Sequence, residues 1–155
     1  MIDVRVDVEV DSALVIGLEC DAARCLGFLD ESDRELSVVL VSDAQMRPLN
    51  RSWRGKDKTT DVLSFPQGPG PVLGDIVISI ETANSQARER SHSLATELRV
   101  LLVHGLCHLR GYDHEASDEA AAMRDAEQVL LRHLTAAGEA VPAGLVLTAT
   151  IGPAF

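Results

Sequence analysis

Residues 93–114, SLATELRVLLVHGLCHLRGYDH, predict a long apolar helix followed by a sharp turn. Ser93 is a favourable N-cap residue, and Gly111 can adopt the left-handed conformation in which many helices end. Two histidines lie on this predicted helix, and a third follows the turn. The apolar positions recur at the spacing of a helix face, at Leu94, Leu98, Leu101, Leu102, Leu106 and Leu109.

On both sides of this helix the chain alternates β-branched runs with helical patterns. Strands are predicted at residues 2–10, 36–41, 60–65 and 73–80, and helices at residues 12–26, 43–50, 81–90 and 117–134. The third strand is expected to stop at Pro66, which has no N–H to donate to a ladder. The predicted fold class is α/β (α+β), with a four-stranded mixed sheet covered by about five helices and a zincin-like HxxxHxxxxxH metal-site helix.

The composition indicates one ordinary globular domain. A length of 155 residues, with 46% hydrophobic and 25% charged residues, predicts a single domain over residues 1–155, although the tail after about residue 138 shows no period. The amino terminus does not resemble a signal peptide, and no apolar run is long enough to cross a membrane. Three cysteines, Cys20, Cys25 and Cys107, suit a reducing compartment and are expected to be small buried residues. A cytoplasmic protein without membrane contact is expected.

The charge distribution points to one local site for an anion. A net charge of −10 argues against a surface that binds nucleic acid as a whole, because phosphate affinity comes from clustered Lys and Arg. Five basic residues nevertheless lie between positions 47 and 58, in a segment expected to end as a loop. On charge alone, a patch that binds a polyanion and a solvated loop are equally good interpretations.

Three histidines carry the chemical prediction. His104 and His108 are four residues apart, hence about 40° apart around a helix and one turn along it, so that both imidazoles can face one ion. Gly111 lets the chain reverse, and His114 can return as a third ligand. Three protein ligands leave one coordination position open, which distinguishes a catalytic zinc site from a structural one. The expected cofactor is one zinc ion, for which other divalent transition metals can substitute.

The spacing also occurs in metzincin peptidases, but one group is missing. Those enzymes carry a glutamate directly after the first histidine as general base, and this chain has Gly105 there. Without that carboxylate, peptide hydrolysis loses a contribution of about 10²–10⁴ in rate. Asp113 can accept a proton or orient an imidazole, and a role in capping the turn explains it equally well.

Three motifs in one order resemble a known family. The run RGKDKTTDVLSFP at residues 54–66, the strand LGDIVIS at residues 73–79 and the element HGLCHLRGYDH at residues 104–114 resemble the YbeY family of bacterial endoribonucleases. The resemblance covers about positions 35–135. Two positions depart from the family pattern: Thr59 stands where proline is usual, and Cys107 where an aliphatic residue is usual.

The resemblance implies a metal-dependent, single-strand-specific endoribonuclease for late ribosomal RNA maturation, at the 3′ end of the small-subunit RNA, and for ribosome quality control. It places the metal ligands at His104, His108 and His114, and the family's functional arginine at Arg54. Zinc-activated water is expected to cleave the phosphodiester, with Arg54 and His114 as catalytic residues and Arg54, Lys56 and Lys58 binding RNA. The implied partners are single-stranded ribosomal RNA, the small ribosomal subunit and ribosome-assembly proteins.

Two other functions are compatible with the same residues. One is a zinc peptidase or another hydrolase of the same fold, against which Gly105 argues. The other is a ribosome-assembly factor with a structural zinc that binds RNA or proteins without cutting RNA, against which an open coordination position argues. Assays with peptide and RNA substrates side by side distinguish the three functions: a peptidase cleaves peptide, a ribonuclease cleaves RNA, and an assembly factor cleaves neither.

Overall fold

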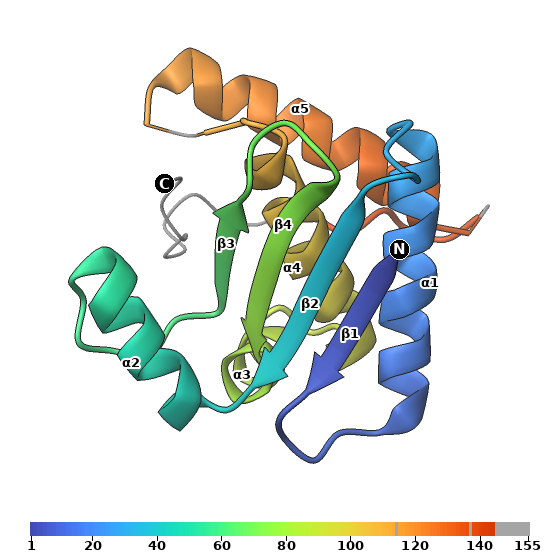
Figure 1. Ribbon diagram of the computed structural model, residues 1–155. Helices are drawn as coiled ribbons and strands as arrows, with labels where there is room; N and C mark the ends of the chain where they lie inside the picture. Colours follow the sequence, from blue (N-terminus) through green and yellow to red (C-terminus); the bar gives the residue numbers. More distant parts are fainter. Residues whose placement is uncertain (114, 137, 145–155) are drawn as a thin grey trace.

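A computed structural model describes residues 1–113, 115–136 and 138–144. It contains the expected five helices and four strands within the described residues (Figure 1). The strands are β1 (Ile2–Val6), β2 (Glu35–Val41), β3 (Val62–Pro66) and β4 (Val72–Ser79). The helices are α1 (Ser12–Phe28), α2 (Asp43–Arg54), α3 (Ile80–Glu89), α4 (Leu94–Leu109) and α5 (Ser117–Leu134).

The four strands form one mixed sheet in the order β1-β2-β4-β3, which confirms the predicted fold class. β1 pairs with β2 and β2 with β4 in parallel, because a helix intervenes in each of these connections. β3 and β4 are joined by a short turn and therefore pair antiparallel. This topology makes β3 an edge strand, directly preceded in the chain by α2 and the basic segment.

The helices cover the two faces of the sheet unequally. Alternate residues of β2 belong to different clusters: Val38 and Leu40 lie in the main core with α1, α4 and α5, whereas Val39 and Val41 lie in a smaller cluster with Met46 of α2. This alternation follows from the two-residue repeat of a strand. Figure 1 shows α2 on the side of the β3 edge, and its first turn contacts α3 through a hydrogen bond from Thr82 to Asp43.

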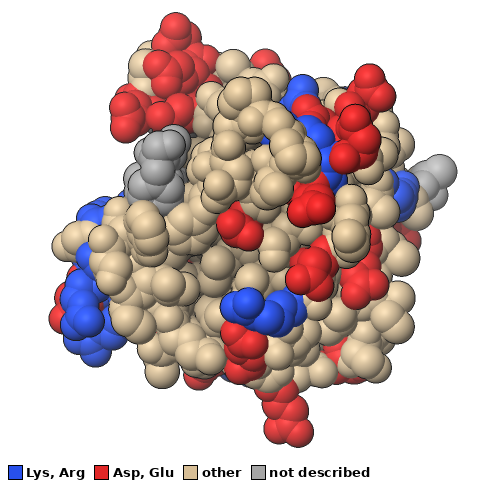
Figure 2. All heavy atoms as spheres, in the orientation of Figure 1, with Lys and Arg blue, Asp and Glu red and all other residues tan. Residues whose placement is uncertain are grey.

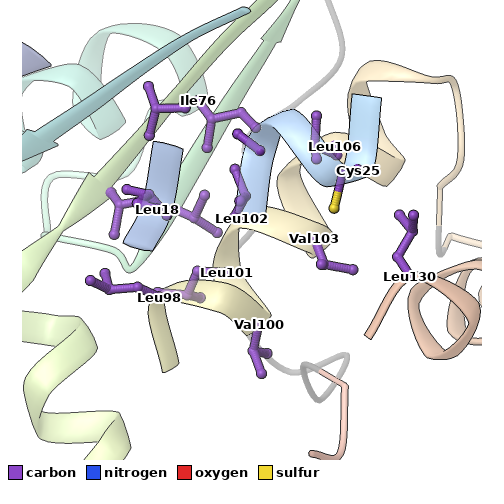
Figure 3. Close-up of a cluster of buried hydrophobic side chains, with 14 of the residues drawn as sticks. Leu18, Cys25, Ile76, Leu98, Val100, Leu101, Leu102, Val103, Leu106 and Leu130 are labelled. Carbon is purple, nitrogen blue, oxygen red and sulfur yellow. The ribbon is translucent and has the colours of Figure 1, made fainter. Parts of the chain in front are cut away.

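α4 is the central helix of the main core. Its residues from Leu98 to Leu109 are almost all buried, and Figure 3 shows side chains of α1, β4 and α5 gathered around it. A helix that is apolar on nearly every side is stable only inside such a layer. α4 therefore holds its two histidines in a fixed, water-poor position.

Two glycines permit unusually close packing near this helix. A Cβ on Gly105 would lie 3.0 Å from two side-chain carbons of Ile76, so this glycine brings α4 close to β4. Gly74 has φ +152°, and a Cβ there would lie 2.5 Å from the carbonyl oxygen of Phe65. The register of β2 with β4 is irregular beside Gly74, at Glu35 and Leu36.

Several predicted details are wrong. The first strand ends at Val6, and Val8 and Val10 pack against the core from the connection that follows. α2 continues to Arg54, where Gly55 ends it with φ 69°, so part of the predicted loop is helix. Cys20 is exposed, unlike Cys25 and Cys107.

No helix among the described residues is long and apolar enough to cross a membrane. Most of the predicted aperiodic tail, residues 145–155, lies outside the described residues.

Candidate functional site

His104 and His108 converge on the same side of α4. Their ring centroids are 4.9 Å apart, and the ring planes meet at 78°. His104 is fully buried, and His108 is 6% exposed. The predicted helical pair of imidazoles is therefore present, close together and shielded from bulk water.

Glu127 of α5 orients the first imidazole. Its Oε1 lies 3.0 Å from Nδ1 of His104, and its side chain is almost completely buried. A carboxylate on one imidazole nitrogen fixes the ring and makes the other nitrogen a better metal ligand. Glu127 was not predicted from the sequence, although it interrupts the apolar face formed by Met123, Leu130 and Leu134.

His114, the predicted third ligand, lies outside the described residues, so its ligand role stays a prediction. Within the described part of the chain, no three His, Cys, Asp or Glu side chains are grouped so that they could hold a metal ion. Cys107 is not an alternative ligand, because it lies in the main core cluster and burial raises the pKa of its thiol.

Asp61 is a buried carboxylate directly before β3. Its side chain is 2% exposed, and it accepts hydrogen bonds from the N–H of Val62 (2.7 Å) and from Nε2 of Gln86 (3.2 Å). Burial raises the pKa of Asp61, and its hydrogen bonds and an electrostatic interaction with His104 counteract this effect. Asp61 also interacts electrostatically with Arg54. The charge of Asp61 thus has an electrostatic influence on Arg54, and Asp61 itself is influenced by His104.

Arg54 is the last residue of α2 and is half-buried. Its Nη1 donates to Oδ1 of the fully buried Asn50 (3.4 Å), whose Nδ2 donates to the carbonyl oxygen of Lys58 (2.8 Å). Burial lowers the pKa of Arg54, while Asp61 raises it. An arginine remains charged under these conditions. Arg54 is therefore a cation held in a defined place by α2.

Lys56 and Lys58, the other predicted RNA-binding residues, are exposed. Figure 2 shows basic side chains gathered over α2, at the left of the molecule, and acidic ones over the start of α5. Asp57 neutralises part of the basic segment through an ion pair with Arg47 (2.9 Å). The basic segment is consequently a local feature on an otherwise acidic surface.

The chain was compared with known proteins. A family model described as endoribonuclease YbeY matches residues 18–135. An endoribonuclease YbeY from Anaeromyxobacter sp. (strain Fw109-5) is 47% identical over 131 residues, which are 82% of this chain and 68% of that protein. One from Aquifex aeolicus (strain VF5) is 46% identical and covers 75% of this chain and 81% of that protein.

A plant protein and a solved structure are also similar. The chloroplastic endoribonuclease YBEY of Arabidopsis thaliana is 50% identical over 107 residues, which are 64% of this chain and 18% of that protein. The solution structure of TM1509 from Thermotoga maritima matches with a TM-score of 0.66 and 29% identity, over 86% of this chain and 89% of that one. The similarity thus extends from the motifs to the fold.

Proposed function

Because this chain belongs to the YbeY family, we propose that it is a metal-dependent endoribonuclease that cleaves single-stranded ribosomal RNA. The observation that carries the proposal is the buried imidazole pair of His104 and His108, whose ring centroids are 4.9 Å apart. Arg54, half-buried at the end of α2, supplies a fixed cation. This arrangement combines metal-binding side chains with a cation suited to a phosphate.

Zinc suits the residues present. Imidazole nitrogens are preferred zinc ligands, and the Glu127 carboxylate behind His104 is the usual support for such a ligand. His104 and His108 would hold the ion, with His114 as the proposed third ligand. When bound, zinc lowers the pKa of water towards neutrality and polarises the bond to be cut. Other divalent transition metals can occupy the same nitrogen ligands.

The protein side chains perform the remaining tasks. Arg54 binds the scissile phosphate through its planar fork and stabilises the negative charge that grows during cleavage. Lys56 and Lys58 guide the strand towards it. His114 takes part in cleavage through its proposed ligand role.

The position after the first histidine supports RNA rather than peptide cleavage. Gly105 faces Ile76, and even a Cβ there would lie 3.0 Å from that side chain. The space therefore excludes the general-base glutamate that metzincins carry at this position. A phosphodiester already bears negative charge, so its cleavage depends more on charge neutralisation than on such a base.

We place this activity in late maturation of the 3′ end of the small-subunit ribosomal RNA and in ribosome quality control. The proposed partners are the small ribosomal subunit and ribosome-assembly proteins. The buried thiols of Cys25 and Cys107 suit the reducing cytoplasm, which is the proposed compartment. Depletion of the protein should therefore lead to accumulation of small-subunit RNA with unprocessed 3′ ends, detected by mapping RNA ends.

The mechanism is tested with purified protein, bound zinc, and single-stranded and duplex RNA. His114→Ala is expected to lose both zinc and cleavage. Arg54→Glu is expected to retain zinc and lose at least about 10²-fold in single-turnover rate, as when one charge-stabilising donor is removed. Arg5→Glu, at the opposite edge of the sheet, is the matched control and should cleave normally.

Two results would contradict this assignment. Undiminished cleavage by Arg54→Glu would remove Arg54 from the mechanism. Zinc-loaded wild-type protein that binds RNA without cutting it would support the non-catalytic assembly factor instead.

A further inference from the structure

A cavity of about 440 Å³ lies beside the candidate site and includes His108 in its lining. Its walls come from three places in the chain: Glu31 and Arg34 before β2, the β3–β4 turn at Gly68, and Arg110 just after α4. Ligand-binding pockets commonly have volumes of roughly 300–1,000 Å³. A nucleotide-sized group in this cavity would therefore lie against one of the two candidate imidazoles.

Arg34 forms part of the cavity wall. Its Nε donates to the carbonyl oxygen of Gly70 (2.8 Å), and its Nη2 donates to the carbonyl oxygens of Gly68 and Val72. Its Nη1 donates to Glu31 (3.1 Å). Because its donors hold the β3–β4 turn in place, Arg34 shapes the cavity and is not available to a ligand.

Arg110 has a different environment. It caps α4 two residues after His108, and its side chain is 32% exposed. Within the described residues its one ion pair joins Nη1 to Oε1 of Glu31 (2.7 Å). A partly exposed pair of this kind contributes little stability, so Arg110 can exchange Glu31 for a phosphate at low cost. Its planar fork suits a phosphate oxygen pair.

The cavity lies at the end of β3 that is farther along the chain from the basic segment. β3 begins after α2 and the basic segment and ends at the turn that lines the cavity (Figure 1). Its five residues span on the order of 15 Å. β3 also contacts α4, since Oγ of Ser64 donates to the carbonyl oxygen of Gly105 (3.5 Å). Arg54 therefore precedes β3 in the chain, and Arg110 lines the cavity beside the residues at the other end of β3.

We propose that this cavity is a binding subsite for the nucleotide that adjoins the scissile phosphate of single-stranded RNA, and that Arg110 binds the phosphate of that nucleotide. Glu31 holds Arg110 in the RNA-free protein, and Arg34 fixes the wall. The proposal rests on the proposed ribonuclease function and adds a second anchor to Arg54.

The test uses zinc-loaded, full-length variants and a short, unstructured, fluorescently labelled RNA. Arg110→Ala is expected to raise KM about five- to ten-fold with little change in kcat, as for loss of a charge-assisted contact to the substrate. The slope of log(kcat/KM) against log salt should fall by about 0.7, the value for one phosphate contact on a single strand. Glu31→Gln should lower KM, because it releases Arg110.

Arg99→Ala is the matched control. Arg99 lies on α4 and, like Arg110, pairs with an acidic residue, Asp21 of α1 (2.9 Å), but it does not line this cavity. It should leave KM and the salt slope unchanged. If Arg110 had only a structural role, Arg110→Ala and Glu31→Gln would change KM in the same direction. The subsite predicts opposite changes in KM for the two variants.

Equal KM values and salt slopes for Arg110→Ala and Arg99→Ala would overturn the subsite. Fluorescence anisotropy with the same RNA gives the same comparison from dissociation constants. If the wild-type protein binds but does not cleave, the proposed function fails, and the binding data still decide the subsite. If cleavage is normal and the Arg110 and Glu31 variants bind like wild type, the subsite alone fails.

Discussion

The carboxylate of Glu127 determines how His104 faces the candidate metal position, because it occupies Nδ1 of that ring. Glu127→Gln keeps the size of the side chain and removes its charge. Zinc affinity, measured by competition with a chelator, is expected to fall about 10–100-fold, the usual effect of losing such a partner. Glu119→Gln, at an exposed position in the first turn of the same helix, should bind zinc like the wild type. Equal affinities for the two variants would exclude the orienting role.

Among single residues, the sequence predicted those site side chains whose spacing along a helix places them next to each other. His104 and His108 were found because a four-residue interval on a helix brings two rings together. Glu127 and Asp61 were missed, because their roles depend on contacts between elements distant in the chain. Glu97 shows why a buried glutamate is an ambiguous signal: it is also fully buried on a helix, but it pairs with His92 (2.6 Å) away from the site.

The carboxylate of Asp43 joins three elements and the connection that follows α2. Oδ1 of Asp43, in the first turn of α2, accepts hydrogen bonds from Thr59 (3.0 Å), from Ser79 at the end of β4, and from Thr82 of α3 (2.6 Å). Asp43→Ala leaves three hydroxyl groups without this acceptor and is expected to cost about 1–3 kcal/mol. Chemical denaturation measures the loss, with the exposed Asp33→Ala as a control that should change little.

The pH dependence of this junction has a definite sign. Burial alone would raise the pKa of Asp43, but hydrogen bonds from Ser79, Thr82 and Thr59 outweigh it and the pKa is lowered. A carboxyl with a lowered folded-state pKa stabilises the protein above its unfolded pKa of about 3.9 and loses that contribution as pH falls through the folded-state value. The difference in unfolding free energy between wild type and Asp43→Ala should therefore shrink below about pH 4. A difference that grows on acidification would contradict this assignment.

The contact between α4 and β4 has no spare volume at Gly105. Gly105→Ala places a Cβ 3.0 Å from the buried Ile76, and overpacking of this kind costs about 1–3 kcal/mol. Gly17→Ala is the matched control, since nothing lies within 4 Å of its Cβ on α1. That control should gain about 0.5–1 kcal/mol from helix propensity. Denaturant midpoints that shift in the same direction for both variants would show that Ile76 can move aside.

Element types were easier to predict than element ends. The β-branched run of β2 and the recurring apolar positions of α4 are clear patterns, and both elements lie where they were predicted. The end of α2 was predicted too early, because the charged residues after Asn50 read as a loop until Gly55 closes the helix. The order of the strands was not predicted, because pairing depends on how helices pack across the sheet.

At the scale of the molecule, an acidic protein must bind an acidic substrate through a small basic area. The double variant Lys56→Gln with Lys58→Gln lowers the net charge of −10 by two and is expected to weaken RNA binding and reduce its salt dependence, with zinc content unchanged. The double variant Arg5→Gln with Arg124→Gln makes the same charge change at exposed positions elsewhere. Anisotropy titrations at several salt concentrations should separate the two. Equal weakening would mean that total charge, and not the basic segment, governs binding.

Gly105, the glycine after the first histidine, also limits which catalytic activities this fold can acquire by mutation. Its neighbour in β4 occupies the room that a longer side chain would need. A single codon change at this position therefore cannot install the carboxylate of a peptidase without separating helix from sheet and moving both imidazoles with it. Mutational paths from this protein to proteolysis are expected to require prior remodelling of the strand, so selection for peptide cleavage should first recover smaller residues in place of Ile76.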